Sequence, residues 1–403
     1  MARLTRRQRA ALTALHRWLG LGLGLLFTLL GATGSLLVFY VEADRALNPP
    51  QQLQATIGQP RSLDDIVALL QTAHPQRHGS WRLELPLTPQ QPLQARYYQP
   101  EETAARDFAP LMVTVDPYRP AILQERFWGT YAATWIYDLH FNLLLDRNGR
   151  LILGLAALAL LALILIGLLL WWPARGRLKA ALRPRLGPSG PRRIYDLHVL
   201  PGIYGLPLLL LLTVTGAVLE QPGWFKPLLA RFSPVDAGPR PVAEHGAVLI
   251  GPQQALRIAQ ATLPDAEVRW LETPAAGGGF YRLRLYQPGD PSRRFPHSLI
   301  WIDAERGEVL AVREARWDSG ADTFFNWLHP LHNGEAFGLT GRLLVALAGL
   351  LPGLLLLTGL WRWRQKARAR RGESSTQPAS GTPRAIPADT SARPRRGNGV
   401  VVK

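Results

Sequence analysis

Four long apolar segments divide the chain. They cover roughly residues 16–41, 151–172, 198–219 and 343–361, and the second reads LILGLAALALLALILIGLLLWW. Because a helix needs about 20 apolar residues to cross a bilayer, each segment predicts a transmembrane helix. Buried helices of a large soluble protein are the alternative, which an apolar run of this length disfavours. The first segment is too long for the apolar region of a signal peptide and lacks a clean cleavage site, so it predicts a retained anchor.

Two polar segments, 42–148 and 220–338, separate the apolar ones. Each opens with an amphipathic helix, SLDDIVALLQTAHP in one and PQQALRIAQATLP in the other. Strands with alternating apolar positions follow, such as YRLRLYQP, and then the related hairpins MVTVDPYRPAIL and LIWIDAERGEVL, in which Asp116 matches Asp303. These patterns predict an α+β fold for each segment.

The two halves of the sequence match each other in order. The matches are His16 and His198, each 18 residues before the glycine of TGSLL or TGAVL; His140 and His332, each ten residues before Arg150 or Arg342; and Trp135 and Trp327, each five residues before one of the latter histidines. We therefore expect two tandem repeats of helix, α+β domain and helix. Because both halves have the same topology, an axis along the membrane normal would relate them.

The net charge of +17 is concentrated beside the apolar segments. Residues 3–9 carry four arginines, the loop 173–193 carries seven basic residues and no acid, and the tail after Trp361 begins RWRQKARARR. The positive-inside rule places all three segments, and with them both termini, in the cytoplasm. The two polar segments then lie on the periplasmic or extracellular face. Membrane lipid is thus the expected partner of these charges, and we expect no nucleic acid.

The spans and their orientation predict eight successive regions. They are a cytoplasmic N-terminus and first span (1–41), a first periplasmic domain (42–148), a second span (149–172), a basic cytoplasmic loop (173–195), a third span (196–219), a second periplasmic domain (220–338), a fourth span (339–363) and a disordered cytoplasmic tail (364–403). The absence of cysteine excludes disulfides, thiolate catalysis, Cys-ligated iron–sulfur clusters and covalent attachment of haem.

Five of the nine histidines lie at predicted membrane boundaries. His16 and His198 begin the outward helices, whereas His140, His329 and His332 precede the inward ones. A single such histidine can simply solvate a helix end. The repeat, however, pairs His16 with His198 and His140 with His332, and two imidazoles between helices suit the axial ligands of a b-type haem. Zinc or copper stays an alternative, with few candidate acids (Asp138, Asp196 and Glu335). The remaining histidines, 74, 78, 245 and 297, are expected at the surface.

His332 is the expected ligand of the outer haem, because the repeat partner of His329 is Tyr137. His329 is then either the alternative ligand or a polar group near that site. Asp138 and Asp196, in the two YDLH sequences, orient a ligand or cap a helix. Arg150 and Arg342 either pair with haem propionates or anchor the helices at the interface.

These residues resemble the PepSY-associated transmembrane proteins, also called iron-regulated membrane proteins. The resemblance covers roughly residues 10–365 and rests on HRWLGL, TGSLL, TGAVL, LHFNLLLDRNGR, LHPLHNGEAFGLTGR and the two hairpins. It implies a membrane α-helical fold with four transmembrane helices and two periplasmic PepSY-like domains. It also implies an inner-membrane ferric-siderophore reductase that holds b-type haem, two by the histidine count, and releases Fe(II). The chain has no Gly-rich nucleotide motif, so the electron donor, a quinol or a cytoplasmic flavoreductase, is separate.

Two other functions compete with a reductase. The chain can be a membrane-anchored, non-enzymatic PepSY module that binds a peptidase or a transport partner. It can also be a transporter, which would place acids in the middle of the membrane, where the four apolar segments have almost none.

Overall fold

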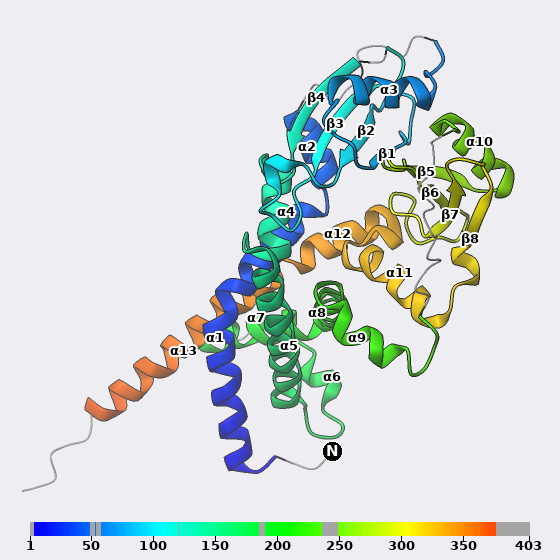
Figure 1. Cartoon of the computed structure of the whole chain (residues 1–403). Coiled ribbons are helices and arrows are strands. Elements are labelled where there is room, and N and C mark those ends of the chain that lie inside the picture. The colour runs from blue at the N-terminus through cyan, green and yellow to red at the C-terminus, as the bar shows by residue number, and fades with distance from the viewer. Residues whose placement is uncertain are drawn as a thin grey trace, which may run out of the picture.

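The computed structural model describes residues 4–48, 53, 58–119, 121–184, 190–235 and 249–375, with side chains to residue 369. The chain forms a helical part that extends away from a single β-sheet (Figure 1). Most of the predicted tail, from residue 376 on, and His245 lie outside the described residues.

Three helical stretches among the described residues are long and apolar enough to cross a membrane. They are α1 (Arg6–Leu37), α5 (Asp146–Trp171) and Glu335–Ala369, which contains α12 (Gly338–Ala348) and most of α13 (Leu351–Ser375). Helix α13 thus continues well beyond the predicted end of the last span at residue 363. The sequence of each stretch explains its length, because none has a central charge that would have to be buried in lipid.

The predicted third span is two helices, α7 (Gly190–Tyr204) and α8 (Leu206–Glu220), that meet at an angle of 59°. Pro201 and Pro207 flank the junction at Gly205. A proline lacks the N–H of the helix ladder and its ring clashes with the carbonyl four residues earlier, so two prolines within one turn of Gly205 account for the bend. The pair has the composition of one span only if both helices are counted together.

The eight strands found among the described residues form one antiparallel sheet with the order β4-β3-β2-β1-β5-β6-β7-β8. The strands are β1 (Trp81–Glu84), β2 (Leu93–Tyr97), β3 (Leu111–Asp116), β4 (Ala121–Phe127), β5 (Glu267–Glu272), β6 (Phe280–Tyr286), β7 (Ser298–Asp303) and β8 (Val309–Arg313). The order in each half mirrors the other about the β1–β5 contact, where Leu83 lies opposite Leu271. The two predicted periplasmic domains therefore share one sheet.

The two predicted amphipathic helices are confirmed as α3 (Leu63–Ala73) and α10 (Pro252–Thr262). Their apolar faces enter a core common to both halves, in which Ile66, Leu70 and Ala255 are fully buried beside strand residues such as Leu83 and Leu271. The helix starts are also tied together, since the Leu63 amide donates to Gln253 and the Gln253 amide donates to Asp64.

Asp116 and Asp303, matched by the predicted repeat, end β3 and β7 in the same way. One carboxylate oxygen of each accepts hydrogen bonds from the backbone amides two and three residues later, a turn that aspartate favours. The mirrored strand order and these turns agree with two tandem repeats, which stay a prediction.

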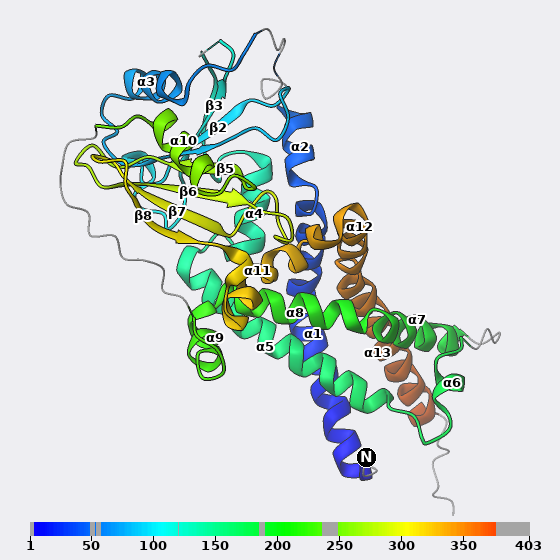
Figure 2. The same ribbon diagram turned by 90° about the vertical axis from the view of Figure 1, so that its right-hand side faces the viewer.

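Short helices connect the sheet with the long ones (Figure 2). They are α2 (Tyr40–Leu47), α4 (Ala132–Asn142), α9 (Pro222–Leu229) and α11 (Gly320–His332). The described residues also form α6 (Leu178–Ala181), which lies between α5 and α7, and turns of 3-10 helix at Glu101–Thr103, Ala315–Trp317 and Glu335–Phe337. Helix α4 packs against α1, and α11 packs against α8. These two contacts bring the histidines of α4 and α11 against long helices from elsewhere in the sequence.

Candidate functional site: two histidine pairs

Two pairs of histidines meet between helices, as the sequence predicted. The sheet-distal pair consists of His16 of α1 and His198 of α7, with ring centroids 6.4 Å apart. The sheet-proximal pair consists of His140 of α4 and His332 of α11, with centroids 6.3 Å apart. Each ring is half-buried. Each pair unites residues that are far apart in the chain, so only the packing of the helices brings its two rings together.

Threonine hydroxyls determine which nitrogen of three of these rings is free. Thr33, Thr215 and Thr358 each donate their hydroxyl hydrogen to a carbonyl one turn earlier in their own helix, at 2.7 or 2.8 Å. Each threonine oxygen then acts as acceptor for a histidine Nδ1–H. The contacts are Thr33 to His140 at 3.0 Å, Thr215 to His332 at 2.9 Å and Thr358 to His198 at 3.0 Å. A donor hydrogen at Nδ1 leaves the lone pair on Nε2.

His16 has the same tautomer, with its hydrogen on Nδ1, without a threonine partner. Its Nδ1 lies 3.2 Å from the carbonyl oxygen of Leu163, which can only accept, so Nδ1 carries the hydrogen. The residue that corresponds to the threonines is Ile166. In all four rings Nε2 is therefore the nitrogen with a lone pair, and it makes no hydrogen bond to any described residue.

A glycine lies against each of the four rings. A Cβ built on Gly34 would stand 3.0 Å from Cε1 of His140, and one on Gly167 would stand 3.0 Å from Cε1 of His16. The equivalent distances are 3.2 Å from Gly216 to His332 and 3.4 Å from Gly359 to His198. The missing side chain is what lets each imidazole approach the neighbouring helix. Each glycine ends the pattern Leu-x-x-(Thr or Ile)-Gly on that helix.

This pattern is what the sequence reasoning missed. From the sequence, TGSLL and TGAVL served only as markers of the repeat, although each contains a threonine and a glycine that contact a histidine ring. Thr358 and Gly359 form a third copy of the Thr-Gly dipeptide, which the predicted repeat did not include. The signal was present in the sequence, as glycine preceded by a β-branched residue once in each apolar segment.

The spacing of the rings suits a metal between them. An imidazole nitrogen binds a metal at about 2.0 Å and lies a little over 1 Å from the centre of its own ring. Two imidazoles on opposite sides of one ion therefore have centroids about 6.3 Å apart, close to both values found here. The described residues contain no group of three or more His, Asp or Glu arranged for a metal ion. Two ligands, both neutral, suit the axial positions of haem iron better than zinc.

A cavity of about 540 Å³ contains the sheet-proximal pair. This volume falls within the roughly 300–1,000 Å³ of cofactor pockets. The long helices contribute apolar lining residues such as Phe27, Leu212 and Val345, whereas α2 and the loop between β6 and β7 contribute arginines. We call this second, polar end of the cavity its mouth. His16 and His198 are not among its lining residues. The residues of the sheet-proximal site thus fit a flat, mostly apolar group with charged edges.

His329 lines the same cavity but does not belong to a pair. Its ring meets the edge of Phe295, with centroids 5.0 Å apart, and its Nδ1 lies 3.4 Å from the amide of Asn333. The structure thus brings His332, rather than His329, opposite His140, and their role as ligands stays a prediction.

The two acids of the YDLH sequences have arginine partners. Asp138 is buried and accepts hydrogen bonds from Arg106 at 2.6 Å and from the indole of Trp128 at 2.8 Å. Burial raises the pKa of Asp138, and these two donors oppose the rise. Asp196 pairs with Arg192 one turn away. Three of the histidine rings contact threonine hydroxyls, and a role of the two acids toward a ligand stays a prediction.

Two of the expected surface histidines are not at the surface. His74 is 8% exposed and lies 3.0 Å from Glu125, with its ring against Trp81. His297 is half-buried and bonded to Asp290. Both sit in the core or the loops of the sheet, where a polar sequence context gave no sign of burial. His78 is exposed, as expected.

The two arginines expected at haem propionates differ in position. Arg342 lines the cavity and pairs with Glu42 at 2.7 Å. Arg150 bonds to the Glu220 carbonyl at 3.0 Å and is not among the cavity residues. Three further arginines, at positions 45, 293 and 294, line the mouth, and the sequence reasoning did not single them out.

A comparison with known proteins matches almost the whole chain. The sequence model of the PepSY-associated TM region covers residues 13–366, which includes both histidine pairs and all eight strands. No curated protein matches the chain.

Proposed function

The chain belongs to the PepSY-associated transmembrane family, and on that premise we propose that it is a haem-containing reductase of the bacterial inner membrane. It passes electrons across the membrane to ferric-siderophore iron in the periplasm and releases Fe(II). The iron chelate is the substrate, and the electron donor is a separate quinol or cytoplasmic flavoreductase.

The repeated arrangement of the four histidines carries this proposal. Each ring has its Nδ1 hydrogen committed to an oxygen, its Cε1 edge on a glycine, and its partner ring at a distance that suits a shared ion. Haem b held by His16 with His198, and by His140 with His332, would supply reversible one-electron chemistry at both sites.

The chain's own residues prepare these sites. The acceptors at Nδ1 select the tautomer with a free Nε2 and raise its basicity as a ligand. The apolar helices around the rings exclude water, and among the described residues no further His, Asp or Glu joins a pair to form a site for a competing divalent ion. Because electron transfer makes and breaks no bond to the protein, no general acid, base or nucleophile is needed.

The positions of the pairs give the route a direction. Helix α1 carries His16 near its start, and Gly34, which contacts His140, lies 18 residues later. Eighteen residues of α-helix rise about 27 Å, close to the thickness of the bilayer core. With the basic segments in the cytoplasm, the sheet-proximal pair faces the periplasm and its cavity opens under the sheet.

The sheet fits a role as the substrate-holding part. In the proposed topology it is built from two tandem repeats, each with a PepSY-like domain on the periplasmic side. Loops from both halves reach the mouth of the cavity, with Leu87 and Gln91 from one and Phe295 from the other. A chelate held there would lie close to the sheet-proximal pair.

An absorption spectrum of the purified protein tests this function. We expect a Soret band, a split α-band after reduction with dithionite and two haems per chain, followed by reoxidation when a ferric siderophore is added. A protein without a Soret band would favour the alternative, a membrane-anchored PepSY module that binds a peptidase or transport partner. If the protein holds haem but no ferric chelate reoxidises it, the reductase assignment is refuted while haem binding stands.

A further inference from the structure

Four arginines line the mouth of the sheet-proximal cavity, and they divide into two kinds. Arg342 pairs with Glu42 at 2.7 Å, and Arg293 pairs with Glu267 at 2.8 Å. Arg45 and Arg294 make no ion pair with any described carboxylate. The mouth thus holds two guanidinium groups that form no direct ion pair within the described part of the protein.

Among the described residues, the side chains that contact Arg294 are neutral. It donates to the hydroxyl of Tyr40, and its guanidinium lies 4.7 Å from the centre of the Tyr40 ring and 5.1 Å from that of Phe295. These contacts orient the group without compensating its charge.

Arg45 lies one turn further along the helix that carries Tyr40. It is half-buried, and burial, followed by the charge of Arg294, lowers its pKa, although Glu42 and Asp44 oppose this shift. The nearby acids are engaged elsewhere, since Asp44 pairs with Arg126 and Glu42 pairs with Arg342. Two like charges kept close and partly out of water are costly unless an anion joins them.

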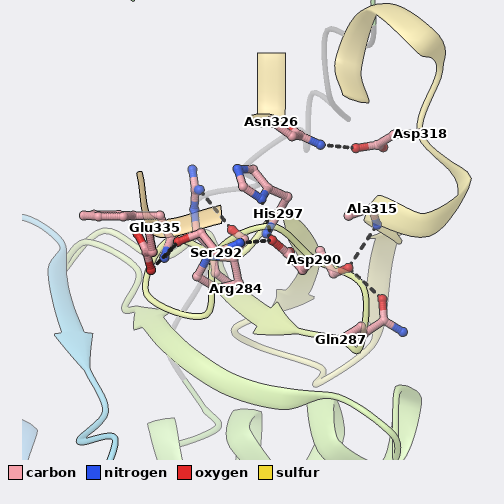
Figure 3. A network of polar contacts seen from close by, with 12 residues as sticks. Arg284, Gln287, Asp290, Ser292, His297, Ala315, Asp318, Asn326 and Glu335 are labelled. Atoms are coloured by element: carbon pink, nitrogen blue, oxygen red, sulfur yellow. Dashed lines mark hydrogen bonds and ion pairs between the residues drawn. The ribbon is translucent and has the colours of Figure 1, made fainter. Parts of the chain in front are cut away.

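The loop that carries Arg294 is held in place by a polar network (Figure 3). Asp290 accepts hydrogen bonds from the backbone and ring of His297 at 2.8 Å. Ser292 donates to Glu335 at 3.1 Å, which ties the loop to the turn after α11. Glu335 also accepts from Asn333 at 3.3 Å, so the acid at this end of the mouth is occupied by neutral donors. The position of Arg294 is thus coupled to the helix that carries His332.

We propose that Arg45 and Arg294 form a binding site for carboxylate groups at the mouth of the cavity, and that its occupants are the propionates of the haem held by His140 and His332. A planar guanidinium matches a carboxylate with two parallel hydrogen bonds. The cavity is apolar around the histidines and basic at the mouth, as an apolar macrocycle with two acidic groups on one edge requires. This inference rests on the proposed function and moves the propionate contacts from Arg150 to Arg45 and Arg294.

Haem binding to the full-length protein tests the pair. The double variant Arg45→Gln/Arg294→Gln is compared with Arg293→Gln, a matched control at the same mouth whose arginine already has Glu267. Each is loaded with haem b or with its dimethyl ester, which lacks the propionate charges. In the wild type we expect the ester to bind one of the two sites at least about tenfold more weakly, since hydrogen bonds between charged groups are lost.

The double variant should bind haem b as weakly as the wild type binds the ester, with no further loss for the ester, and the midpoint potential of one haem should fall. Arg293→Gln should match the wild type. A second source of carboxylate is the substrate. If a substrate carboxylate occupies the site, the double variant keeps its haem loading. Its KM then rises for ferric citrate but not for a trihydroxamate chelate. This result also supports a carboxylate site at Arg45 and Arg294.

A double variant that equals Arg293→Gln in haem affinity, potential and both KM values would overturn the inference while leaving the reductase intact. A wild type that binds no haem would instead overturn the proposed function on which the inference rests.

Discussion

The two histidine pairs share their local construction and differ in their surroundings. All four rings use an acceptor at Nδ1 and a glycine at Cε1, and the centroid distances agree within 0.1 Å. The sheet-proximal pair opens into a polar-mouthed cavity, whereas His16 and His198 do not line it. In the proposed function, the shared construction would give both pairs the same ligand chemistry, and the difference in access would decide which pair meets a bulky substrate.

The pairs also differ in one residue of the repeated pattern. Both rings of the sheet-proximal pair contact a threonine hydroxyl, but in the sheet-distal pair Ile166 replaces the threonine behind His16. A carbonyl that already accepts within its helix is then the acceptor for His16. We expect the sheet-distal pair to have unequal ligands and therefore a different potential.

Removal of a paired histidine should have the largest effect. His140→Ala or His332→Ala should abolish one of the two haems, because a single remaining axial ligand does not hold the group, while the sheet-distal haem stays. Pyridine haemochrome assays per mole of protein measure this. His78→Ala, at an exposed position, is the control, and loss of both haems in His140→Ala would contradict the independence of the two sites.

Filling the space behind a ring should come next. Gly34→Val would push against His140, and overpacking of about 1–3 kcal/mol corresponds to roughly fivefold to 150-fold weaker haem binding at the sheet-proximal site. Gly22→Val on the same helix meets nothing within 4 Å and should leave both sites unchanged. Equal haem contents in the two variants, measured after gel filtration, would mean that the glycine contact is incidental.

Exchange of the hydroxyl tests the difference between the pairs. Thr33→Val removes the acceptor for His140, which should weaken haem binding about tenfold and raise the midpoint potential, because the ligand becomes less basic. Ile166→Thr should do the opposite at His16 and bring the two pairs closer in potential. Redox titration at a fixed pH gives both values, and unchanged potentials in both variants would rule out this role.

Change of the unpaired histidine should have the smallest effect. His329→Ala keeps both rings of the sheet-proximal pair and should retain two haems, with at most a small shift in the Soret maximum. If His329→Ala loses one haem and His332→Ala does not, His329 rather than His332 is the ligand.

The sequence predicted much of the candidate site because the relevant signals are local or repeated. Apolar length located the spans, and the repeat paired His16 with His198 and His140 with His332 before any contact was known. The roles of Asp138 and Asp196 could not be predicted, since an acid two residues from a histidine on a helix points to another face. Asp138 accordingly meets Arg106 and Trp128 rather than a ring.

By itself, then, the sequence determined the apolar spans, the two amphipathic helices α3 and α10, the aspartate turns and the identity of the paired histidines, because each depends on periodicity or on residues close in the chain. Only the tertiary structure decided that the strands join into one sheet through β1 and β5, that Thr33 and Gly34 contact a histidine from α4, and that Arg45 and Arg294 line the same cavity. Those contacts join residues 100 or more positions apart, and they depend on how helices and strands pack rather than on any pattern within them.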